Sequence, residues 1–587
     1  LITEHLFACY HNRMKTRFID LNLSKIGIFL ISFIFLGHQL FYILRGGVTW
    51  DETLDTWGSG KNIENFKFFI TRQESFELST LPAQWFGQLI KLPIYLFSRS
   101  EIINNLFSDF IYFFTSNKTT YIESFFNLRH FLLNFYIFLS IFVIYYFCKK
   151  VTNSYKLSLL ILFFIFTNPI FIGHSMFNLT DVPMAIHILI ASLVYIERII
   201  LNKADKKDFL IVGIFFGLSL LNRISAAAFL LPLGIYYLIV NSRNLNLFST
   251  IKNHMYILIS TIFVLLVGSP GFYIDPQHYI NGLIYSQFTG QDFYAYLPLN
   301  GNMIFSLDWN PEYLLSLFLY KLPLVVVIFL TIGLFKLNVI TSHLFRYSYV
   351  FLIYVLLVHE IYRPSVFNYF RHYLFLIPFI CIPVAYVFIN LIDGKSKTFK
   401  IIFSASILFY SIYTQTGLEQ YKYVYVNELV NEESISEDCI DSYEFNGCGS
   451  WQTDYYGFSG KETIQIVENL KLDNVFICEP GHSYSLFIKG NDYWKINNGN
   501  PDFDDYGFWE QYDFIYNINH FNEFIDENSQ GYFYILAIHS PGYKTCNFHR
   551  LETNFIDLNC KIDQAIKRDL RETSVNLNYI HYCEYST

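Results

Sequence analysis

The stretch KIGIFLISFIFLGHQLFYILRGGVTWDE, residues 25–52, joins a long apolar run to an acidic tripeptide, Trp50-Asp51-Glu52. The apolar run, 26–44, has the length that a helix needs to cross a bilayer. Carboxylates this close to the hydrocarbon are costly, which makes Asp51 and Glu52 candidates for function. The plain alternatives are a solvated loop or a helix cap.

The composition is that of a membrane protein. The 587 residues are 53% hydrophobic and 15% charged, whereas soluble domains carry about 25% charged residues. Apolar runs of bilayer length recur through the first two-thirds of the chain, so we expect a polytopic α-helical membrane protein. The sequence has no basic stripe of the kind that binds nucleic acid.

About eleven transmembrane helices are predicted, in a membrane domain at 1–415 that is followed by a soluble domain at 416–587. The Lys and Arg residues of the short loops gather in every second loop, that is, on one side of the membrane, and the intervening loop 272–313 has none. Because basic loops stay in the cytoplasm, the N-terminus is predicted to be cytoplasmic and the soluble domain to lie outside. The predicted spans are 26–44, 127–148, 155–173, 182–201, 208–221, 225–241, 254–270, 314–335, 345–360, 371–392 and 400–415.

The first outer loop, 45–126, is too long to be a simple connector. Within it, residues 83–97 and 102–114 mix apolar and polar side chains at helical spacing. We expect two helices, which either lie in the membrane interface or pack within the loop.

The C-terminal region is expected to be a small mixed α/β domain. Residues 460–470 have a helical pattern, and 474–478 and 531–538 have strand patterns. An even number of cysteines outside the cytoplasm allows up to three disulfides, with reduced core cysteines as the alternative. The six cysteines are Cys439, Cys448, Cys478, Cys546, Cys560 and Cys583.

A second acidic segment precedes the fourth predicted span, on the same outer side as Asp51. It runs His174-Ser175-Met176-Phe177-Asn178-Leu179-Thr180-Asp181. Asp181 stands before Val182-Pro183, where aspartate is a good N-cap and proline fits the first helical turn. Capping and a catalytic role for Asp181 are compatible.

Few basic residues are predicted on the outer side. Arg223 ends the fifth span, Lys321 lies within the eighth, Arg363 follows the ninth, and Arg371-His372 opens the tenth. Contact with lipid headgroups is the plain interpretation of Lys321 and Arg371. As a cluster they can neutralise a lipid phosphate, because arginine binds phosphate oxygens bidentately and lysine adds a point charge.

In their order and sidedness, these motifs resemble those of GT-C-fold glycosyltransferases that use polyprenyl-phosphate sugars, such as protein O-mannosyltransferases and the aminoarabinose transferase of lipid A. Asp51-Glu52 is similar to the acidic pair after that family's first span, and Asp181 to its second acidic site. Further similar segments are 217–223, 371–378, 421–428 and 453–459. The resemblance covers about 26–460 in arrangement.

The resemblance implies an inverting enzyme that moves a sugar from a polyprenyl-phosphate donor to a glycan, lipid or protein acceptor at the outer membrane face. Inversion needs one carboxylate base, for which Asp51 is the candidate. Glu52 or Asp181 would orient the acceptor or tune the pKa of the base. The residues implied to bind substrate are His174, Arg223, Lys321, Arg371 and His372.

No metal or other cofactor is expected, although Asp51, Glu52, Asp181 and His174 include ligands that a divalent ion accepts. The expected location is a bacterial inner membrane, with the C-terminus outside; the endoplasmic reticulum membrane is the alternative. A transporter or flippase of a lipid-linked substrate is a second functional hypothesis, and an O-antigen ligase or polymerase is a third. No motif identifies the sugar, the acceptor, the lipid length or the oligomeric state.

Overall fold

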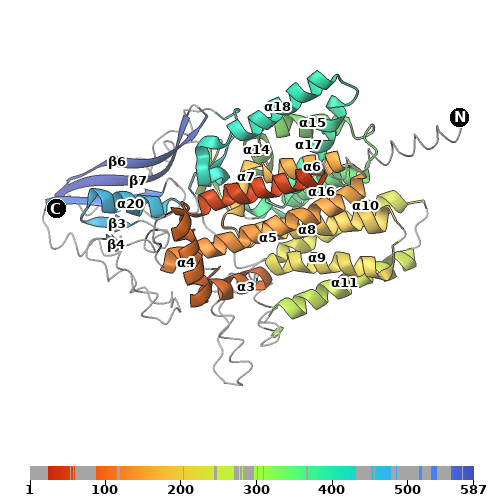
Figure 1. The fold of residues 1–587 in the computed structure, drawn as a ribbon, viewed down its shortest axis with the longest axis horizontal. Helices are drawn as coiled ribbons and strands as arrows, with labels where there is room; N and C mark the ends of the chain where they lie inside the picture. Colours follow the sequence, from red (N-terminus) through yellow and green to blue (C-terminus); the bar gives the residue numbers. More distant parts are fainter. Residues whose placement is uncertain are drawn as a thin grey trace.

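A bundle of helices forms one part of the protein, and a β-sheet from the C-terminal region lies at one end of that bundle (Figure 1). The computed structural model describes residues 24–49, 88–115, 121–202, 204–243, 247–269, 296–300, 302–308, 310–364, 368–430, 457–477, 530–538, 557–571 and 573–586, with short pieces between them that include Asp51, Glu52, Asp55, Thr56, Trp451, Thr453 and Asp454.

The described part of the chain contains five helices long and apolar enough to cross a membrane, or up to eight if each bent pair is one span. This makes the chain an integral membrane protein. A helix overlaps every predicted span, but the count of eleven spans stays a prediction. The bundle helices are Ser24–Ile43, α5 (Tyr121–Thr152), α6 (Tyr155–Phe166), α7 (Pro169–Ser175), α8 (Asp181–Tyr195), η2 (Ile196–Ile200), α9 (Lys206–Asn222), η3 (Ile224–Phe229), α10 (Leu230–Asn241), α11 (Leu247–Gly268), α14 (Tyr313–Tyr320), α15 (Leu324–Phe335), α16 (His343–Tyr362), η4 (Tyr369–Tyr373), α17 (Leu376–Ile392), α18 (Lys397–Tyr413) and η5 (Thr416–Val424).

The prediction of one continuous helix at 314–335 is wrong. The axes of α14 and α15 meet at 115°, with the break at Lys321-Leu322-Pro323. Proline has no backbone N–H and its ring blocks the preceding helical turn, so Pro323 cannot sit inside a straight helix. The predicted span at 155–173 is also bent, by 67° between α6 and α7.

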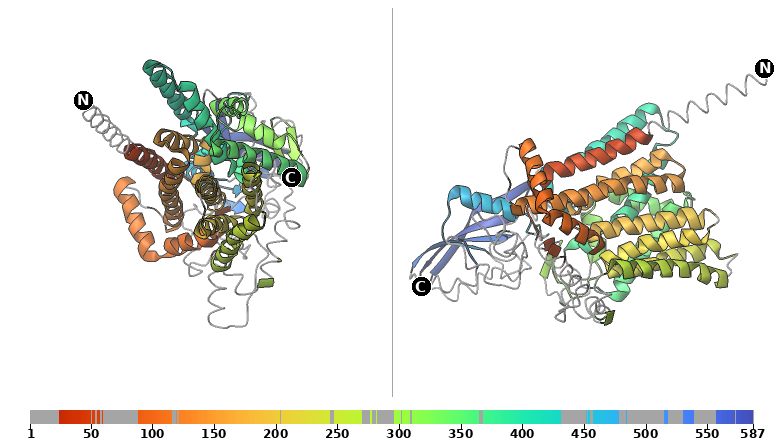
Figure 2. Two further views of the ribbon diagram at one scale, coloured as in Figure 1. Left: turned by 90° about the vertical axis from the view of Figure 1, so that its right-hand side faces the viewer. Right: turned by 60° about the horizontal axis from the view of Figure 1, so that its bottom comes forward.

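Two helices occupy the first loop, as predicted. They are α3 (Gln88–Arg99) and α4 (Glu101–Thr115), and both pack on α5 near the end of the bundle that meets the sheet (Figure 2). On its outer face α4 exposes Ile102, Leu106 and Phe113, which are 74%, 65% and 80% accessible. An apolar stripe on the outer face of a packed helix is typical of a helix in the membrane interface.

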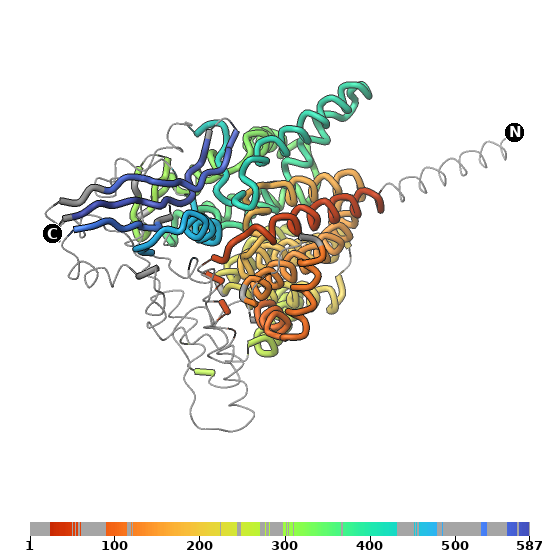
Figure 3. The backbone as a smooth tube through the Cα atoms, turned by 60° about the vertical axis from the view of Figure 1, so that its left-hand side comes forward, coloured from red at the N-terminus to blue at the C-terminus, as the bar shows by residue number. Residues whose placement is uncertain are grey.

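The C-terminal sheet has five strands in the order β4-β3-β5-β7-β6, beside one end of the bundle (Figure 3). The two β3 pairings are parallel, whereas β7 pairs antiparallel with β5 and β6. Helix, β3 and β5 occupy the positions predicted for them, but the long β6–β7 hairpin was not predicted. The elements are α20 (Gly460–Leu470), β3 (Val475–Ile477), β4 (Ile515–Asn517), β5 (Gln530–Ile538), β6 (Asp557–Leu570) and β7 (Thr573–Ser586), and a separate two-stranded sheet pairs β1 (Tyr296–Leu299) with β2 (Asn302–Phe305).

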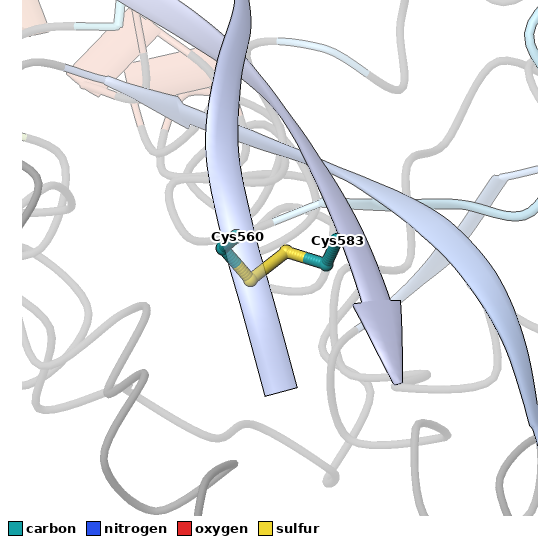
Figure 4. Close-up of a disulfide and its surroundings, with 2 residues drawn as sticks. All are labelled: Cys560 and Cys583. Atoms are coloured by element: carbon teal, nitrogen blue, oxygen red, sulfur yellow. A yellow bond between two sulfur atoms is a disulfide. The ribbon is translucent and has the colours of Figure 1, made fainter. Parts of the chain in front are cut away.

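One disulfide, Cys560–Cys583, joins directly opposed residues of β6 and β7 (Figure 4). It agrees with the expectation that some of the six C-terminal cysteines are oxidised. The other four C-terminal cysteines lie outside the described residues.

Glycines allow the chain to approach itself closely at several places, of which three connect the helices and the C-terminal region. A Cβ atom on Gly47 would lie 3.0 Å from Phe458 C, and one on Gly417 would lie 2.8 Å from Asp569 C. A Cβ atom on Gly173 in α7 would lie 2.8 Å from Lys422 C in η5 and closer still to Tyr423 N. Each neighbour is backbone, which cannot rotate away as a side chain can.

We predict that Gly173→Ala destabilises the protein, because an added methyl group would push η5 away from α7. Overpacking of this kind costs about 1–3 kcal/mol. The measurement is the thermal unfolding midpoint in detergent, with Gly37→Ala as the matched control. A Cβ atom on Gly37 meets nothing within 4 Å, so that helical substitution should be neutral or slightly stabilising. Equal midpoints for the two variants would contradict the close approach.

Candidate active site

Thr49 and Glu52 form a capping box that orients the acidic tripeptide. The backbone N–H of Thr49 donates to Glu52 Oε2 at 2.9 Å, and the N–H of Glu52 lies 3.3 Å from Thr49 Oγ1. This is the reciprocal arrangement that begins many helices, with Thr at the cap and Glu three residues later. Thr49 is therefore the capping residue, and Glu52 completes the capping box. The Asp51 side chain takes no part in the cap and pairs with Arg371 instead.

Glu52 is buried and engaged from two sides. Its Oε1 lies 2.6 Å from His130 Nε2, and its backbone carbonyl accepts from Arg129 Nη1 at 3.1 Å. The side chains of Glu52 and His130 are 2% and 1% exposed. These contacts favour a role in positioning the turn, because the carboxylate has little access to a substrate.

Asn178 holds the second acidic segment. Its Oδ1 accepts from the N–H of Asp181 at 2.8 Å and from the N–H of Thr180 at 3.1 Å. Helix α8 begins after Thr180, and Asp181 is its first residue. The expectation that Asp181 is the N-cap of this helix is therefore wrong, because Thr180 occupies the N-cap position. Because Asn178 satisfies the local backbone N–H groups, the Asp181 carboxylate is available for longer-range ion pairs.

Two arginines meet the carboxylates of Asp51 and Asp181. Arg223 binds Asp181 bidentately, through Nε to Oδ1 at 2.5 Å and through Nη2 to Oδ2 at 3.2 Å. Arg371 places Nε 3.7 Å from Asp181 Oδ2 and pairs through Nη2 with Asp51 Oδ2. The order of charges is therefore Asp51, Arg371, Asp181, Arg223, a set we call the ion-pair array.

The ion-pair array is assembled from four distant segments. Asp51 follows the first span, Asp181 begins α8, Arg223 ends α9 and Arg371 lies in η4. Asp181 is fully buried, whereas the side chains of Asp51, Arg223 and Arg371 are 21%, 16% and 11% exposed. Asp51 and both arginines are thus partly exposed, whereas the Asp181 carboxylate is enclosed by the array.

Burial and the Arg371 guanidinium act in opposite directions on the pKa of Asp51. The net result is a pKa above the ordinary value of an aspartate, because burial raises it by more than Arg371 lowers it. A carboxylate with a raised pKa accepts a proton more readily than a solvated one. Asp51 is therefore a partly exposed carboxylate with a raised pKa.

The other predicted residues lie around the array in different ways. His174 is buried, with Nδ1 3.4 Å from Asn178 Nδ2, so it supports the turn that holds Asp181. His372 is close enough to Asp181 and Arg223 for electrostatic interaction.

Lys321 lies at the break between α14 and α15. Its Nζ donates to Val424 O at 3.3 Å and lies over the rings of Tyr369 and Trp451, 4.6 and 5.1 Å from their centroids. These contacts are structural, since they join the break to the segment after the last helices. Binding of a substrate phosphate by Lys321 stays a prediction.

Within the described residues, no group of three or more His, Cys, Asp and Glu side chains is placed to hold a metal ion. The carboxylates named as candidate ligands are instead paired with His130, Arg223 and Arg371. In the described residues, the carboxylates of Asp51, Glu52 and Asp181 are therefore arranged for ion pairs and do not form a ligand set for a divalent ion.

Sequence reasoning missed the ion pair of Asp55 with Lys91, which links the turn after Asp51 to α3. Lys91 is almost fully buried there, and burial lowers its pKa. Its signal in the sequence is a lone lysine within an apolar helical stretch, Ile90-Lys91-Leu92.

The helices long and apolar enough to cross a membrane and the ion-pair array between them define an integral membrane protein with a charged site. The family described as dolichyl-phosphate-mannose-protein mannosyltransferase matches residues 128–272. That match includes the segment of Asp181 and Arg223, and over those residues it confirms the resemblance to membrane glycosyltransferases of the mannosyltransferase type.

Solved structures similar to this chain are more distant. ArnT from Cupriavidus metallidurans bound to undecaprenyl phosphate is 9% identical, with a TM-score of 0.43 and 95% of this chain and 97% of that chain covered. The S. cerevisiae protein O-mannosyltransferase Pmt1-Pmt2 complex is 11% identical, with a TM-score of 0.29 and coverages of 47% and 38%. No curated protein matches the chain in sequence.

Proposed function

We propose that this protein transfers a sugar from a polyprenyl-phosphate donor to an acceptor, with inversion at the anomeric carbon. The observation that carries the proposal is the ion-pair array, which places one accessible carboxylate beside two guanidinium groups at partly exposed positions. The family match over residues 128–272 supports this chemistry.

In the proposed reaction, Asp51 is the base. The acceptor oxygen or nitrogen attacks the anomeric carbon, its proton passes to Asp51, and the bond from that carbon to the lipid phosphate oxygen breaks. The lipid phosphate leaves with the electron pair of that bond. Because charge develops on the phosphate, preorganised cations lower the barrier.

Arg371 and Arg223 hold the departing phosphate in this mechanism. Arginine suits the task, since its planar fork matches two phosphate oxygens. Arg371 is paired with Asp51 in the structure, so a bound phosphate competes with Asp51 for the same guanidinium. Donor binding would thereby loosen Asp51 from its cation and increase its proton affinity, which prepares the base only when the donor is present.

The test is transfer of radiolabelled sugar by the purified protein in detergent, with polyprenyl-monophosphate and polyprenyl-pyrophosphate donors compared and a membrane extract as the acceptor pool. Labelling from the monophosphate supports the proposal. Labelling from the pyrophosphate alone would favour a ligase or polymerase. No labelling by folded protein, together with movement of the donor across reconstituted vesicles, would favour a flippase.

The pH dependence of transfer provides a further prediction. Asp51 works as a base only when it is ionised, so kcat/KM should fall as the pH drops through its pKa. Because burial raises that pKa, the acid limb should lie above pH ~4, the region expected for a solvated aspartate. The measurement is kcat/KM against pH, with circular dichroism at each pH to show that the protein stays folded. A flat profile down to pH ~4 would contradict Asp51 as the base.

A further inference from the structure

Asp454 is a fully buried carboxylate of the C-terminal region, and the hydrogen-bond donors that it meets among the described residues are neutral. Its Oδ1 accepts from the N–H of Phe458 at 2.9 Å and from the hydroxyl of Tyr423. Its Oδ2 accepts from the N–H of Ser459 at 2.9 Å and from the hydroxyl of the same residue. Burying a carboxylate costs free energy that its hydrogen bonds must offset, so the groups that donate to Asp454 are held firmly in place.

The hydrogen bonds of Asp454 connect the sheet to η5. Asn578 of β7 donates to Ser459 Oγ at 2.9 Å, which directs the Ser459 hydroxyl toward Asp454. Thr453 donates to the carbonyl of Asn576 on the same strand. On the other side, Asp454 accepts from Tyr423, a residue of η5. Asp454 thus connects the C-terminal sheet to η5, the segment packed against α7 of the membrane bundle.

Tyr423 continues the connection to the second acidic segment. Its ring meets Phe177 edge-on, with centroids 5.6 Å apart, and lies 6.3 Å from the ring of His174. These two residues flank the turn in which Asn178 orients Asp181.

Phe458 provides a parallel connection to the first acidic segment. Its ring lies 6.1 Å from that of His130, the partner of Glu52, and 5.2 Å from that of Phe177. Its backbone lies against Gly47, just before the capping box. The turn from Asp454 to Ser459 therefore contacts the supports of both acidic segments.

We propose that Asp454 is a positioning residue that fixes, through Tyr423 and Phe458, the separation of Asp51 and Asp181. It does not touch the reacting atoms. Its effect on the rate rests on the proposed glycosyl transfer, but its effect on the order of the acidic segments does not. The C-terminal region is then part of the active-site scaffold, beyond any role in choosing the acceptor.

The test compares Asp454→Asn, Tyr423→Phe and the double variant with the wild-type protein, using Asp473→Asn as the control. Asp473 is an exposed carboxylate of the same region that binds the hydroxyl of Tyr532. The first readout is hydrogen exchange of peptides that cover 46–56 and 172–181. We expect faster exchange in both peptides for Asp454→Asn, with no change for Asp473→Asn.

The second readout is steady-state transfer. We expect kcat to fall on the order of tenfold for Asp454→Asn with little change in KM, as for other losses of transition-state alignment. Asparagine keeps one acceptor oxygen, so Asp454→Asn loses the acceptor contacts of only one carboxylate oxygen. Tyr423→Phe should be less than additive with it, because both changes weaken the same hydrogen-bond network. Additive effects, or unchanged exchange in both peptides, would overturn the proposal. If the wild-type protein transfers no sugar, the proposed function fails while the exchange experiment still tests the positioning.

Discussion

Asp51→Asn is expected to abolish measurable transfer while the protein folds normally. An amide cannot accept the acceptor's proton, and general-base catalysis alone contributes about 10²–10⁴-fold to a rate. The asparagine also loses the charge that pairs with Arg371. Since the Asp51 side chain is 21% exposed and is not the capping residue of its turn, the thermal midpoint should change little.

The matched control is Asp308→Asn, because Asp308 is an exposed carboxylate on a loop that the charge pattern also places outside. The measurement is the initial rate of sugar transfer by each variant at equal amounts of folded protein. Transfer by Asp51→Asn at the wild-type rate would remove Asp51 from the mechanism. In that case Asp181 could not replace it easily, since Arg223 and Asn178 occupy its carboxylate.

Arg371→Gln is expected to lower the rate of sugar transfer by a similar factor, because it removes a cation that stabilises the departing phosphate. Arg371 is the cation between Asp51 and Asp181, and removing one preorganised charge donor costs about 10²–10³-fold in kcat. Arg371→Lys should recover part of the loss, because lysine keeps the charge but not the bidentate fork. Arg363→Gln, at the exposed arginine that caps the C-terminal end of α16, is the control.

The residual activity of Arg371→Gln should also have a shifted pH profile. Arg371 opposes the rise in the pKa of Asp51, so its loss should raise that pKa further. The acid limb of kcat/KM should therefore move to higher pH in this variant. An unshifted limb with a large loss of rate would mean that Arg371 binds the phosphate but does not act on Asp51.

Local patterns predicted the local structure well. Residues 460–470 form the helix that their pattern indicates, and residues 475–477 and 530–538 form strands where the sequence pattern places them. The capping box of Thr49 and Glu52 has a recognisable local spacing, but it was not predicted. These features depend on hydrogen bonds or apolar faces within one short segment. The break at Pro323 was equally visible in the sequence, but the apolar composition on both sides suggested a single helix.

The pairing of charges could not be predicted in the same way. Asp51, Asp181, Arg223 and Arg371 were each identified, but their order depends on how four separate segments pack. Nothing local indicates that Glu52 faces His130 while its neighbour Asp51 faces Arg371. The same limit applies to Asp454, whose partners come from η5 and from its own turn.

The glycine contacts set a limit on exchange of parts between related proteins. Gly47, Gly173 and Gly417 each meet the backbone of a segment far away in the chain, and at each of them a single methyl group would meet that backbone. A chimera that receives the C-terminal region from another protein would therefore need matching glycines in its helical part, even where the catalytic residues are identical. The C-terminal region can therefore be exchanged only together with the helical segments that contact it, and not by itself.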